Sequence, residues 1–397
     1  MKIVILTRWF SEKTGYIENI LPREYAKEGH EVHLVTSNVK TYFNAPEYKD
    51  LYEKFIGPPV VECGVSKLDG YTVHRLPHGS FFGFLYVKGL LRKLIELQPD
   101  IVQEFEVISS NVLTACLATL FCKFKLFIGN HTCLSVSPWT IEQSWQGRLK
   151  RLFAYSIFFP IGRIVSMIAN KCHAATPDCL DLAVKFYGVP RNKCVLSPLG
   201  SDTDLFSPSK TDRDRAERDS LRKELGFSEN DIVCIYTGRF TEAKNPALLA
   251  RAINELMNEG QPYRGLFVGA GSERETKLIE AFQGCVVTSF VRFDQLPRYY
   301  RAADIGVWPR EESTSMLDAA ACGLPIIVSD HLEDRERFEG NGLQYKENDL
   351  SDLKRTLLDL KERKVREGLG AYGSGKIAET RSWRALALAR LKDYALL

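Results

Sequence analysis

The stretch DIVCIYTGRFTEAKNPALLARAINELMNEGQPYRGLFVGAG, residues 231–271, decides the fold class. It begins with a β-branched apolar run, DIVCIYTG (231–238), and ends with a second one, RGLFVGA (264–270). Between the two runs, Asn245 and Pro246 mark the start of a helix. A strand, a crossover helix and a second strand in this order predict a parallel strand pair, so the stretch indicates an α/β protein.

Short apolar runs of the same kind recur along the chain, with helical stretches between them. They are KIVILT (2–7), EVHLVT (31–36), DIVQEF (100–105), FKLFIGN (124–130), CVLSPL (194–199), VVTSF (286–290), DIGVWP (304–309) and PIIVSD (325–330). The densely charged stretch 208–227 has no continuous apolar run and separates two series of strands. We therefore predict two Rossmann-like domains.

The first predicted domain covers residues 1–205 and the second covers 206–380. A C-terminal helix, 381–397, is expected to pack back on the N-terminal domain. In open α/β sheets, ligands bind at the carboxyl ends of the strands. We therefore expect an active site where two such edges face each other across a cleft.

Composition places the chain among ordinary globular proteins, with 45% apolar and 26% charged residues. The net charge is only +3, from 53 basic and 50 acidic side chains, which gives no support to nucleic acid as a partner. The longest uncharged runs, 107–122 and 152–162, are shorter than the ~20 apolar residues that cross a bilayer. The sequence thus predicts a cytoplasmic protein without a transmembrane helix.

Two cations follow the strand at 231–238. Arg239 and Lys244 are expected on the loop at the carboxyl end of this strand, beside the N-terminus of a helix. A guanidinium and an ammonium in this position can bind a diphosphate. The alternative interpretation is that both are solvated loop cations.

Two further segments suggest ligand contacts. Gly269 and Gly271 in VGAGSE (268–273) allow a backbone to approach a ligand, or simply form a turn. In WPREESTSMLDAAACGLPIIVSD (308–330), the hydroxyl residues at 313–315 precede an Ala-rich helix whose free amides favour an oxyanion. Asp318 is expected one turn into this helix, facing the cleft. A capped helix with solvated acids is the alternative.

These three segments, in this order, resemble the nucleotide-sugar domain of retaining glycosyltransferases of family 4, which have the GT-B fold. The family pattern runs roughly G-R-(x4)-K, then V-G-x-G-x-x, then E-x7-E followed by A-x-A-C-G-x-P. The matching residues are Gly238, Arg239, Lys244, Gly269, Gly271, Asp318 and the ACGLP run. Further family-like pieces are GHEVHLVTS (29–37), QPDIVQ (98–103), GVPRNKCVLSPLGSDTDLF (188–206), FDQLPRYYRAADIGVWP (293–309) and RSW (381–383), so the resemblance covers nearly the whole chain.

The resemblance implies a role for each matching residue. Arg239 and Lys244 would bind the pyrophosphate of a UDP- or GDP-linked sugar donor, and Asp318 would take the place of the glutamate that holds the nucleotide ribose. The backbone at Val291 would contact the base. The amides of Thr314 and Ser315 would contact the distal phosphate or the sugar.

His131, directly after the strand at 124–130, matches a histidine of the family. The resemblance implies that this imidazole holds the transferred sugar or steadies the acceptor hydroxyl. The alternative is a structural histidine at a strand end.

Two family features are altered in this chain. Arg310 stands where the first glutamate of E-x7-E belongs, so Glu311 or Glu312 must serve instead, and Glu312 is favoured for the sugar hydroxyls. The N-terminal glycine pair of the family falls on residues 12–13, Glu and Lys, and Gly15 substitutes for it only if the loop shifts.

No metal and no cofactor are expected. The D-x-D patterns at 202–204 and 212–214 resemble a metal-binding motif of another glycosyltransferase fold, but the first lies in an interdomain segment and the second in a charged helix. His30 and His33 lack a third ligand for zinc. In the family that the chain resembles, Arg and Lys neutralise the diphosphate instead of a metal.

Segments 81–97 and 148–168 combine bulky apolar residues with Lys and Arg. We interpret them as core helices. The alternative is contact with the inner face of the membrane, which would bring the enzyme to a lipid-linked acceptor.

The resemblance predicts transfer of a sugar from a nucleotide diphosphate to a hydroxyl of a glycan, a lipid-linked saccharide or a small molecule, with retention. A nucleotide-sugar epimerase on the same fold is one alternative. A non-catalytic sugar-nucleotide-binding homologue is another, because of Arg310 and the missing glycine pair. An NAD-dependent oxidoreductase is disfavoured, because no G-x-G-x-x-G follows the first strand.

Overall fold

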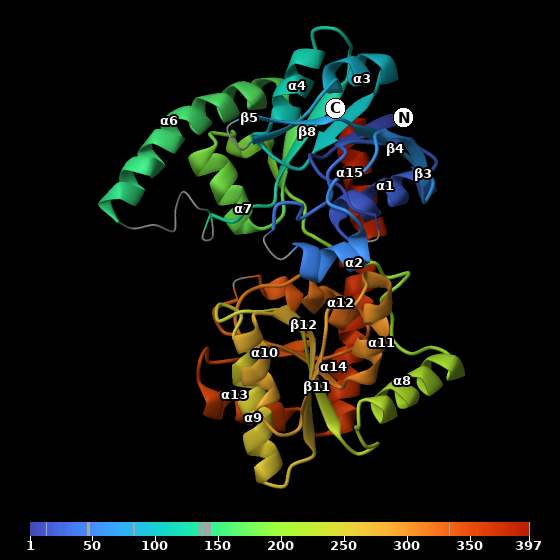
Figure 1. Ribbon diagram of the computed structural model, residues 1–397, viewed down its shortest axis with the longest axis vertical. Coiled ribbons are helices and arrows are strands. Elements are labelled where there is room, and N and C mark those ends of the chain that lie inside the picture. Colours follow the sequence, from blue (N-terminus) through green and yellow to red (C-terminus); the bar gives the residue numbers. More distant parts are fainter. Residues whose placement is uncertain are drawn as a thin grey trace. The chain divides into compact units, whose positions relative to one another are not determined.

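The computed structural model describes residues 1–12, 14–45, 48–81, 84–134, 137, 144–332 and 334–396. It divides into two compact units, the first formed by Met1–Leu199 with Leu386–Leu397 and the second by Gly200–Ala385. The division therefore falls at 199/200, whereas the sequence placed it at 205/206. Each unit has its own mainly parallel sheet flanked by helices (Figure 1), which confirms the α/β fold class.

The second unit contains a six-stranded parallel sheet of order β13-β12-β11-β14-β15-β16. Its strands are β11 (Ile232–Phe240), β12 (Tyr263–Gly271), β13 (Cys285–Thr288), β14 (Ile305–Trp308), β15 (Ile326–Ser329) and β16 (Gly342–Tyr345). The chain starts in the middle with β11, builds outward to β13, and then returns to the other side of β11 with β14. The strand order reverses between β11 and β14, and ligands bind at such a switch point in doubly wound sheets.

Helices cover both faces of this sheet (Figure 1). They are α8 (Asp212–Glu224), α9 (Pro246–Asn258), α10 (Glu273–Glu280), α11 (Leu296–Ala302), α12 (Ser315–Ala321), α13 (Leu350–Asp359) and α14 (Arg363–Lys376), with the shorter turns η4 (Phe293–Gln295), η5 (Arg335–Arg337) and η6 (Ile377–Arg381). The helix α9 begins with Pro246 at its first position, where a missing amide proton costs nothing. Its buried Leu249, Ile253 and Leu256 recur at helical spacing and pack on the sheet.

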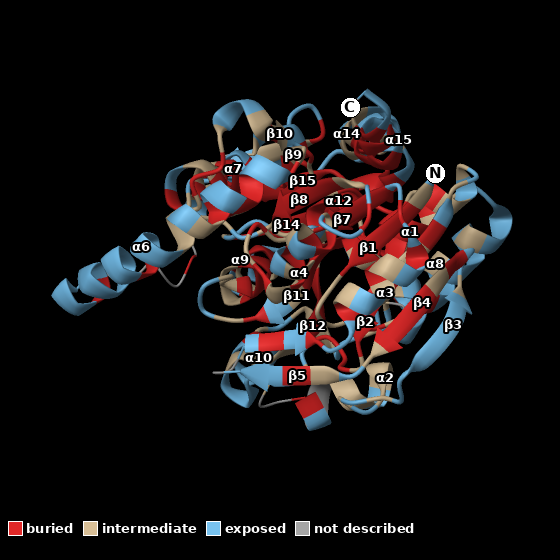
Figure 2. Ribbon diagram, turned by 90° about the horizontal axis from the view of Figure 1, so that it is seen from above, coloured by how far each residue is buried: buried red, intermediate tan, exposed pale blue. Residues whose placement is uncertain are grey.

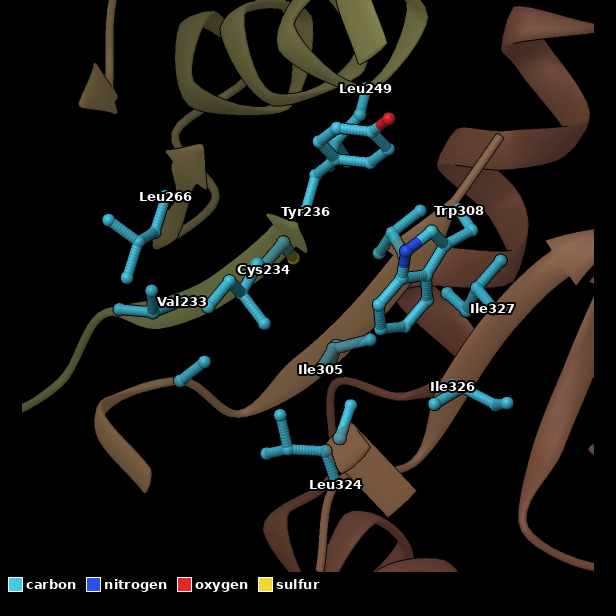
Figure 3. Close-up of a cluster of buried hydrophobic side chains, with 14 of the residues drawn as sticks. Val233, Cys234, Tyr236, Leu249, Leu266, Ile305, Trp308, Leu324, Ile326 and Ile327 are labelled. Atoms are coloured by element: carbon cyan, nitrogen blue, oxygen red, sulfur yellow. The ribbon is translucent and has the colours of Figure 1, made fainter. Parts of the chain in front are cut away.

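Trp308 belongs to the buried core of this unit (Figure 3) and also bonds to residues at the carboxyl edge of the sheet. The indole is 1% exposed, and its Nε1 donates to the Thr237 carbonyl at 3.2 Å and to Ser315 Oγ at 3.1 Å. Thr237 lies near the end of β11 and Ser315 begins α12, so one side chain fixes both elements at the switch point. Truncating a buried tryptophan of this kind costs about 3–5 kcal/mol.

The first unit contains an eight-stranded sheet of order β10-β9-β8-β7-β1-β2-β4-β3, in which only β3 runs antiparallel to its neighbour. The strands are β1 (Lys2–Leu6), β2 (Glu31–Ser37), β3 (Gly64–Leu68), β4 (Tyr71–Leu76), β7 (Ile101–Glu104), β8 (Lys125–Asn130), β9 (Lys171–Ala174) and β10 (Cys194–Leu196), and a separate hairpin holds β5 (His78–Phe81) and β6 (Phe84–Val87). Here the strand order reverses between β1 and β7, which gives this sheet its own switch point.

The helical elements of the first unit include the end of the chain. They are α1 (Ile17–Lys27), η1 (Tyr48–Tyr52), α2 (Glu53–Ile56), α3 (Leu90–Leu97), α4 (Ser110–Ala118), α6 (Trp145–Ile168), α7 (Pro177–Asp181), η2 (Leu182–Phe186), η3 (Arg191–Lys193) and α15 (Trp383–Leu396). Tyr394 of α15 is buried, and its hydroxyl lies 2.9 Å from both Tyr25 Oη and Gln103 Oε1. These bonds attach the last helix to β7 and α1.

The two segments expected to be core helices differ from each other. In segment 81–97, the residues Phe84–Val87 form the strand β6, and Phe84 is 63% exposed, so the prediction of a core helix is wrong there. It is confirmed for α3, in which Leu90, Leu94 and Leu97 are buried. The interpretation is wrong for α6, whose Phe153 and Met167 are 69% and 75% exposed. Most of the α6 ribbon has the colour of exposed residues in Figure 2. Moreover, α6 alone among the helices in the described ranges is long and apolar enough to cross a membrane by length and composition, although no transmembrane helix was expected.

Candidate donor and acceptor sites

The carboxyl ends of β11 and β14 lie side by side, because the two strands pair through Cys234 with Ile305 and Ile235 with Gly306. The chain leaves β11 toward α9 and leaves β14 toward α12. Lys244 Nζ, on the first connection, lies 3.2 Å from Glu311 Oε2, on the second. The structure therefore brings together two segments that the sequence singled out separately.

Arg239 is still part of β11 and pairs with Ala270 of β12, so it does not stand on the loop as expected. The strand continues to Phe240 because Tyr236 Oη donates to the Arg239 carbonyl at 2.9 Å and holds this end of the strand in place. The Arg239 side chain is exposed, and its guanidinium has no ion-pair or hydrogen-bond partner among the residues that the structure describes. Arg239 thus offers its N–H donors to a ligand.

Lys244 is held in place by a tight turn. The Thr241 carbonyl accepts hydrogen bonds from the amides of Lys244 at 3.1 Å and Asn245 at 2.9 Å. Asn245 adopts a left-handed backbone with φ of 48°, and Pro246 then starts α9. The ammonium carries three donors, so its contact with Glu311 leaves others for a phosphate.

Glu312 and Glu311 have different protein partners, and the choice of Glu312 for the sugar stays a prediction. The Glu312 carboxylate is bonded to Arg337, which is only 2% exposed and also donates to Asp334 Oδ2 at 2.9 Å. Glu311 is the acid that lies beside Lys244. Arg337 comes from η5, 25 residues along the chain, so spacing within the motif could not reveal that Glu312 already has a partner.

Arg310, which replaces the first glutamate of the family pattern, bridges two loops. Its Nε and Nη2 donate to Asn348 Oδ1 at 2.9 and 2.6 Å, and its Nη1 donates to the Glu242 carbonyl at 2.9 Å. Glu242 belongs to the turn that carries Lys244. The substitution therefore holds this turn in place without contributing an acid.

Asp318 lies one turn into α12, as expected. The carboxyl is buried, and Ser201 Oγ donates to its Oδ1 at 2.6 Å. Burial raises the pKa of Asp318 to about 7, and the nearby Asp202 adds to this while the bond from Ser201 opposes it. Contact with a ribose stays a prediction.

The start of α12 offers one free backbone donor. Thr314 is the N-cap residue without a side-chain cap, and its amide has no partner within the described part of the chain. Ser315 is more engaged, since its Oγ lies 2.7 Å from Ser313 Oγ and its amide reaches the same oxygen at 3.4 Å. The expected contacts of both amides with phosphate or sugar stay predictions.

Gly269 has a structural explanation. It pairs with Gly238 across β11 and β12, and a Cβ at Gly269 would overlap the Gly238 carbonyl oxygen. Close approach of the two strands therefore accounts for this glycine without a ligand. Val291 is half-buried against the core of the unit, and nothing in the described residues tests its predicted contact with a base.

At the switch point of the first unit, two charged residues that sequence reasoning missed lie together. Arg8, just after β1, donates to Glu106 Oε1, just after β7, at 2.5 Å. The guanidinium also lies 4.6 Å from the ring centre of Trp9. The signal was available, because both residues directly follow strands that the sequence predicts.

A second acid lies beneath this pair. Glu104 is buried and accepts from Ser109 Oγ at 3.0 Å and from the Glu106 amide at 2.5 Å. Burial, and then the charge of Glu106, raise the pKa of Glu104 well above its ordinary value. The edge thus carries polar groups suited to hydroxyl recognition.

His131 follows β8 at the same edge of this sheet. Its ring centre lies 5.6 Å from that of Phe105, and its Nε2 is buried without a hydrogen-bond partner among the residues described. Burial, followed by the charge of Arg390, lowers the pKa of His131 to about 3. The imidazole is therefore neutral near pH 7, with one nitrogen free for a ligand.

The loop after β1 explains the missing glycine pair. Glu12 is bonded to Lys40 and accepts from Arg75 Nη2 at 2.6 Å, so an ion-pair cluster holds this loop. Lys13 lies outside the described residues. Gly15 has φ of 74°, a backbone that favours glycine whether or not a ligand binds there.

The D-x-D pattern at 212–214 has a structural role. Asp214 accepts from the Thr211 amide at 2.9 Å and caps α8. Over the ranges that the structure covers, no group of three His, Cys, Asp or Glu side chains could hold a metal ion.

Two family models match the chain. The model described as Glycosyltransferase Family 4 matches residues 21–205, and the model described as Glycosyl transferases group 1 matches residues 231–363. The chain belongs to glycosyltransferase family 4. This confirms the family that the sequence motifs indicated.

Curated relatives of this family 4 chain match part of its length. D-inositol 3-phosphate glycosyltransferase of Nocardia farcinica is 28% identical over 247 residues, 57% of this chain and 52% of the relative. Spore coat protein SA of Bacillus subtilis is 27% identical over 216 residues, 49% of this chain and 56% of the relative. The chain thus spans about half the length of these relatives.

Solved structures match the whole family 4 chain in fold. Anabaena HepE in complex with UDP-glucose has a TM-score of 0.67 at 14% identity, with 100% of both chains covered. Sucrose-phosphate synthase from Thermosynechococcus elongatus has a TM-score of 0.67 at 17% identity, covering 100% of this chain and 98% of the other. These likenesses confirm the GT-B fold.

Proposed function

We propose that this chain transfers a sugar from a UDP-linked donor to a hydroxyl of a glycan, a lipid-linked saccharide or a small molecule. The proposed reaction proceeds with retention and without a metal or cofactor, in the cytoplasm and at the inner face of the membrane. Family membership and the UDP-glucose complex of HepE support a nucleotide-sugar donor.

The observation that carries the proposal is the pair of cations at the β11–β14 switch point. Arg239 has no partner within the described part of the chain, and Lys244 faces only the acid Glu311. A diphosphate carries more charge than one carboxylate, so it competes well for Lys244. Free donors, a helix N-terminus at α9 and a topological switch point together favour an anionic nucleotide.

In the proposed reaction, the bond between the sugar C1 and the donor phosphate oxygen breaks while the acceptor oxygen bonds to C1 on the same face. The acceptor proton leaves with the departing diphosphate. Arg239 and Lys244 stabilise the negative charge that develops on this leaving group, which is the largest electrostatic demand of the reaction. No protein nucleophile is assigned.

The acceptor belongs to the first unit in this proposal. The Arg8–Glu106 pair and the neutral His131 lie at the carboxyl edge of that sheet and can hold hydroxyl groups. A neutral imidazole with a free Nε2 can donate to or accept from one hydroxyl without adding charge.

Thermal-shift measurements with UDP, GDP, ADP and their sugars test the donor. A ligand at 100 times its Kd stabilises the folded protein by about 2.7 kcal/mol. We expect UDP and one UDP-sugar to raise the melting temperature, and a double variant Arg239→Gln, Lys244→Gln to lose this shift. The control is Arg251→Gln, an exposed cation on α9 that pairs with Glu255 at 3.3 Å. Equal shifts in both variants would rule out the cation pair.

A non-catalytic sugar-nucleotide-binding homologue is the second candidate. The observation in its favour is that Glu312 and Asp318 already hold protein partners, Arg337 and Ser201. Incubating the protein with radiolabelled UDP-sugars separates the two candidates. Release of UDP with formation of a glycosylated product, or hydrolysis of the donor, would exclude this candidate.

A further inference from the structure

The helix α6 has an unusual charge distribution. Its sequence, WQGRLKRLFAYSIFFPIGRIVSMI, contains the cations Arg148, Lys150, Arg151 and Arg163 and no acid. The remaining residues are mainly bulky and apolar. Such a helix has a composition suited to an anionic, apolar surface.

One side of α6 carries large apolar side chains into solvent. Trp145, Leu149 and Phe153, spaced four residues apart, are 69%, 57% and 69% exposed. The pattern continues in the last five residues of the helix with Ile164 and Met167, which are 61% and 75% exposed. Exposed residues run along most of α6, which projects from the body of its unit (Figures 1 and 2). Contiguous apolar surface of this kind marks an interaction site.

The opposite side of α6 is attached to the protein. Ala154, Gly162 and Val165 are buried there. A Cβ at Gly162 would overlap the Tyr187 carbonyl oxygen, so the helix lies directly on the backbone after η2. Phe158 packs beside Phe186 with ring centres 6.3 Å apart. The exposed side is therefore presented by a fixed helix.

A groove of about 290 Å³ lies between α6 and η2, beside the apolar side. Its lining residues are Leu134, Arg148, Arg151, Leu152, Tyr155, Lys185 and Phe186. Arg148 and Arg151 have no ion-pair partner in the ranges that the structure describes, and Lys185 pairs with Asp181 at 2.7 Å. Three cations around an apolar groove suit a ligand that joins a phosphate to a hydrocarbon.

We propose that this groove binds the headgroup phosphate of an anionic phospholipid while α6 lies in the plane of the bilayer surface. Arg148, Arg151 and Lys185 hold the phosphate, and Trp145, Leu149 and Phe153 enter the acyl boundary. This inference rests on the proposed function, which locates the enzyme at the inner face of the membrane. It identifies the surface of the protein that makes this contact.

Charge and attachment select this occupant. A spanning orientation is disfavoured, because it would pull Gly162 and Val165 away from the protein and place Arg163 toward the hydrocarbon. A second copy is disfavoured as well, because a symmetric contact through the same surface brings its cations together. An anionic bilayer matches both the charges and the apolar side.

Flotation with vesicles tests the proposal on the full chain. We expect binding to vesicles of phosphatidylglycerol and phosphatidylcholine, and not to phosphatidylcholine alone. Each cation near an anionic surface contributes about 1 kcal/mol, so the variant Arg148→Gln, Arg151→Gln, Lys185→Gln should bind about 100-fold more weakly. The matched control removes three exposed cations of the second unit, Arg251→Gln, Arg355→Gln and Arg363→Gln, and should bind normally.

Four other outcomes would overturn the proposal. The first is an equal loss of vesicle binding in the control variant, and the second is retention of the protein in vesicles washed with alkaline carbonate. The third is a dimer in sedimentation velocity that Phe153→Ser abolishes. The fourth is thermal stabilisation by free glycerol 3-phosphate that is lost in the variant Arg148→Gln, Arg151→Gln, Lys185→Gln. UDP binding, measured by thermal shift without vesicles, should be the same in all these proteins. A loss of vesicle binding with intact UDP binding separates this proposal from the donor site.

Discussion

Replacing Asp318 by Asn should make the protein more stable relative to the wild type as the pH rises. Burial raises the pKa of Asp318 to about 7 from an ordinary value of 3.8. Between pH 4 and 7 the folded protein therefore keeps a proton that the unfolded chain has lost, so its stability falls as the pH rises through this range. Three pKa units at about 1.4 kcal/mol each correspond to a loss of stability of about 4 kcal/mol. This loss is complete above pH 7 and absent below pH 4.

Asn has the shape of Asp and no charge, so it removes this pH-dependent loss. It also leaves buried N–H donors without partners, which costs about 1–3 kcal/mol at every pH. The quantity to measure is therefore the change in the stability difference with pH. Urea unfolding followed by tryptophan fluorescence at pH 5 and pH 8 provides it, and we expect the difference to shift by about 3 kcal/mol in favour of the variant.

Asp304→Asn is the matched control with the opposite sign. Although burial opposes it, the ion pairs of Asp304 with Arg218 and Arg222, at 2.9 and 3.0 Å, hold its pKa below the ordinary value. Its stabilising effect is lost as the pH falls through the folded pKa, so Asn should destabilise at pH 8 and less so in acid. A flat pH profile for Asp318→Asn, alongside the expected profile for Asp304→Asn, would refute the buried environment deduced for Asp318.

Three further predictions concern the two sites. Lys244→Ala should keep the fold, because Glu311 is the one ion-pair partner of Lys244 among the described residues, and should lose most sugar transfer; transfer assays and circular dichroism check this, and near-normal transfer would contradict it. Glu312→Gln should lower the melting temperature more than Glu311→Gln, because Glu312, and not Glu311, pairs with the buried Arg337 beside Asp334, whereas Glu311→Gln should alter UDP affinity more; the reverse pattern in thermal-shift assays would favour Glu312 as the sugar contact. The folded pKa of His131 is about 3, so the wild-type protein loses stability as the pH falls below the ordinary value of 6.5. His131→Asn should therefore be more stable relative to the wild type at pH 4.5 than at pH 8. NMR titration of the ring between pH 5 and 8 should show no protonation, and a midpoint near 6.5 would disprove the buried environment.

Local sequence patterns were sufficient to predict the fold class. The runs around Cys234 and Leu266 lie in β11 and β12, because β-branched and apolar residues between helix signals are sufficient to identify buried parallel strands. The runs at 2–7 and 100–105 likewise place Arg8 and Glu106 directly after strands. Which strand ends become neighbours depends on the strand order, and the pairing of β1 with β7 was not predicted from the sequence.

The environments that the sequence did not reveal depend on partners distant in sequence. Glu312 was favoured because of its place in a motif, whereas Arg337, from η5, determines its actual environment. Likewise, the apolar residues of α6 suggested a core helix, but its buried residues among those described, such as Ala154, Gly162 and Val165, lie along one side of it. Apolar content measures what a helix can bury and does not say what covers it.

Isothermal titration of UDP and of uridine into the full chain tests the central claim most directly. Charge-assisted hydrogen bonds contribute about 1.5–3 kcal/mol each, so the variant Arg239→Gln, Lys244→Gln should bind UDP at least 100-fold more weakly. Uridine, which lacks the diphosphate, should bind wild type and variant with equal affinity. Unchanged UDP affinity in this variant would show that these two cations do not hold the diphosphate.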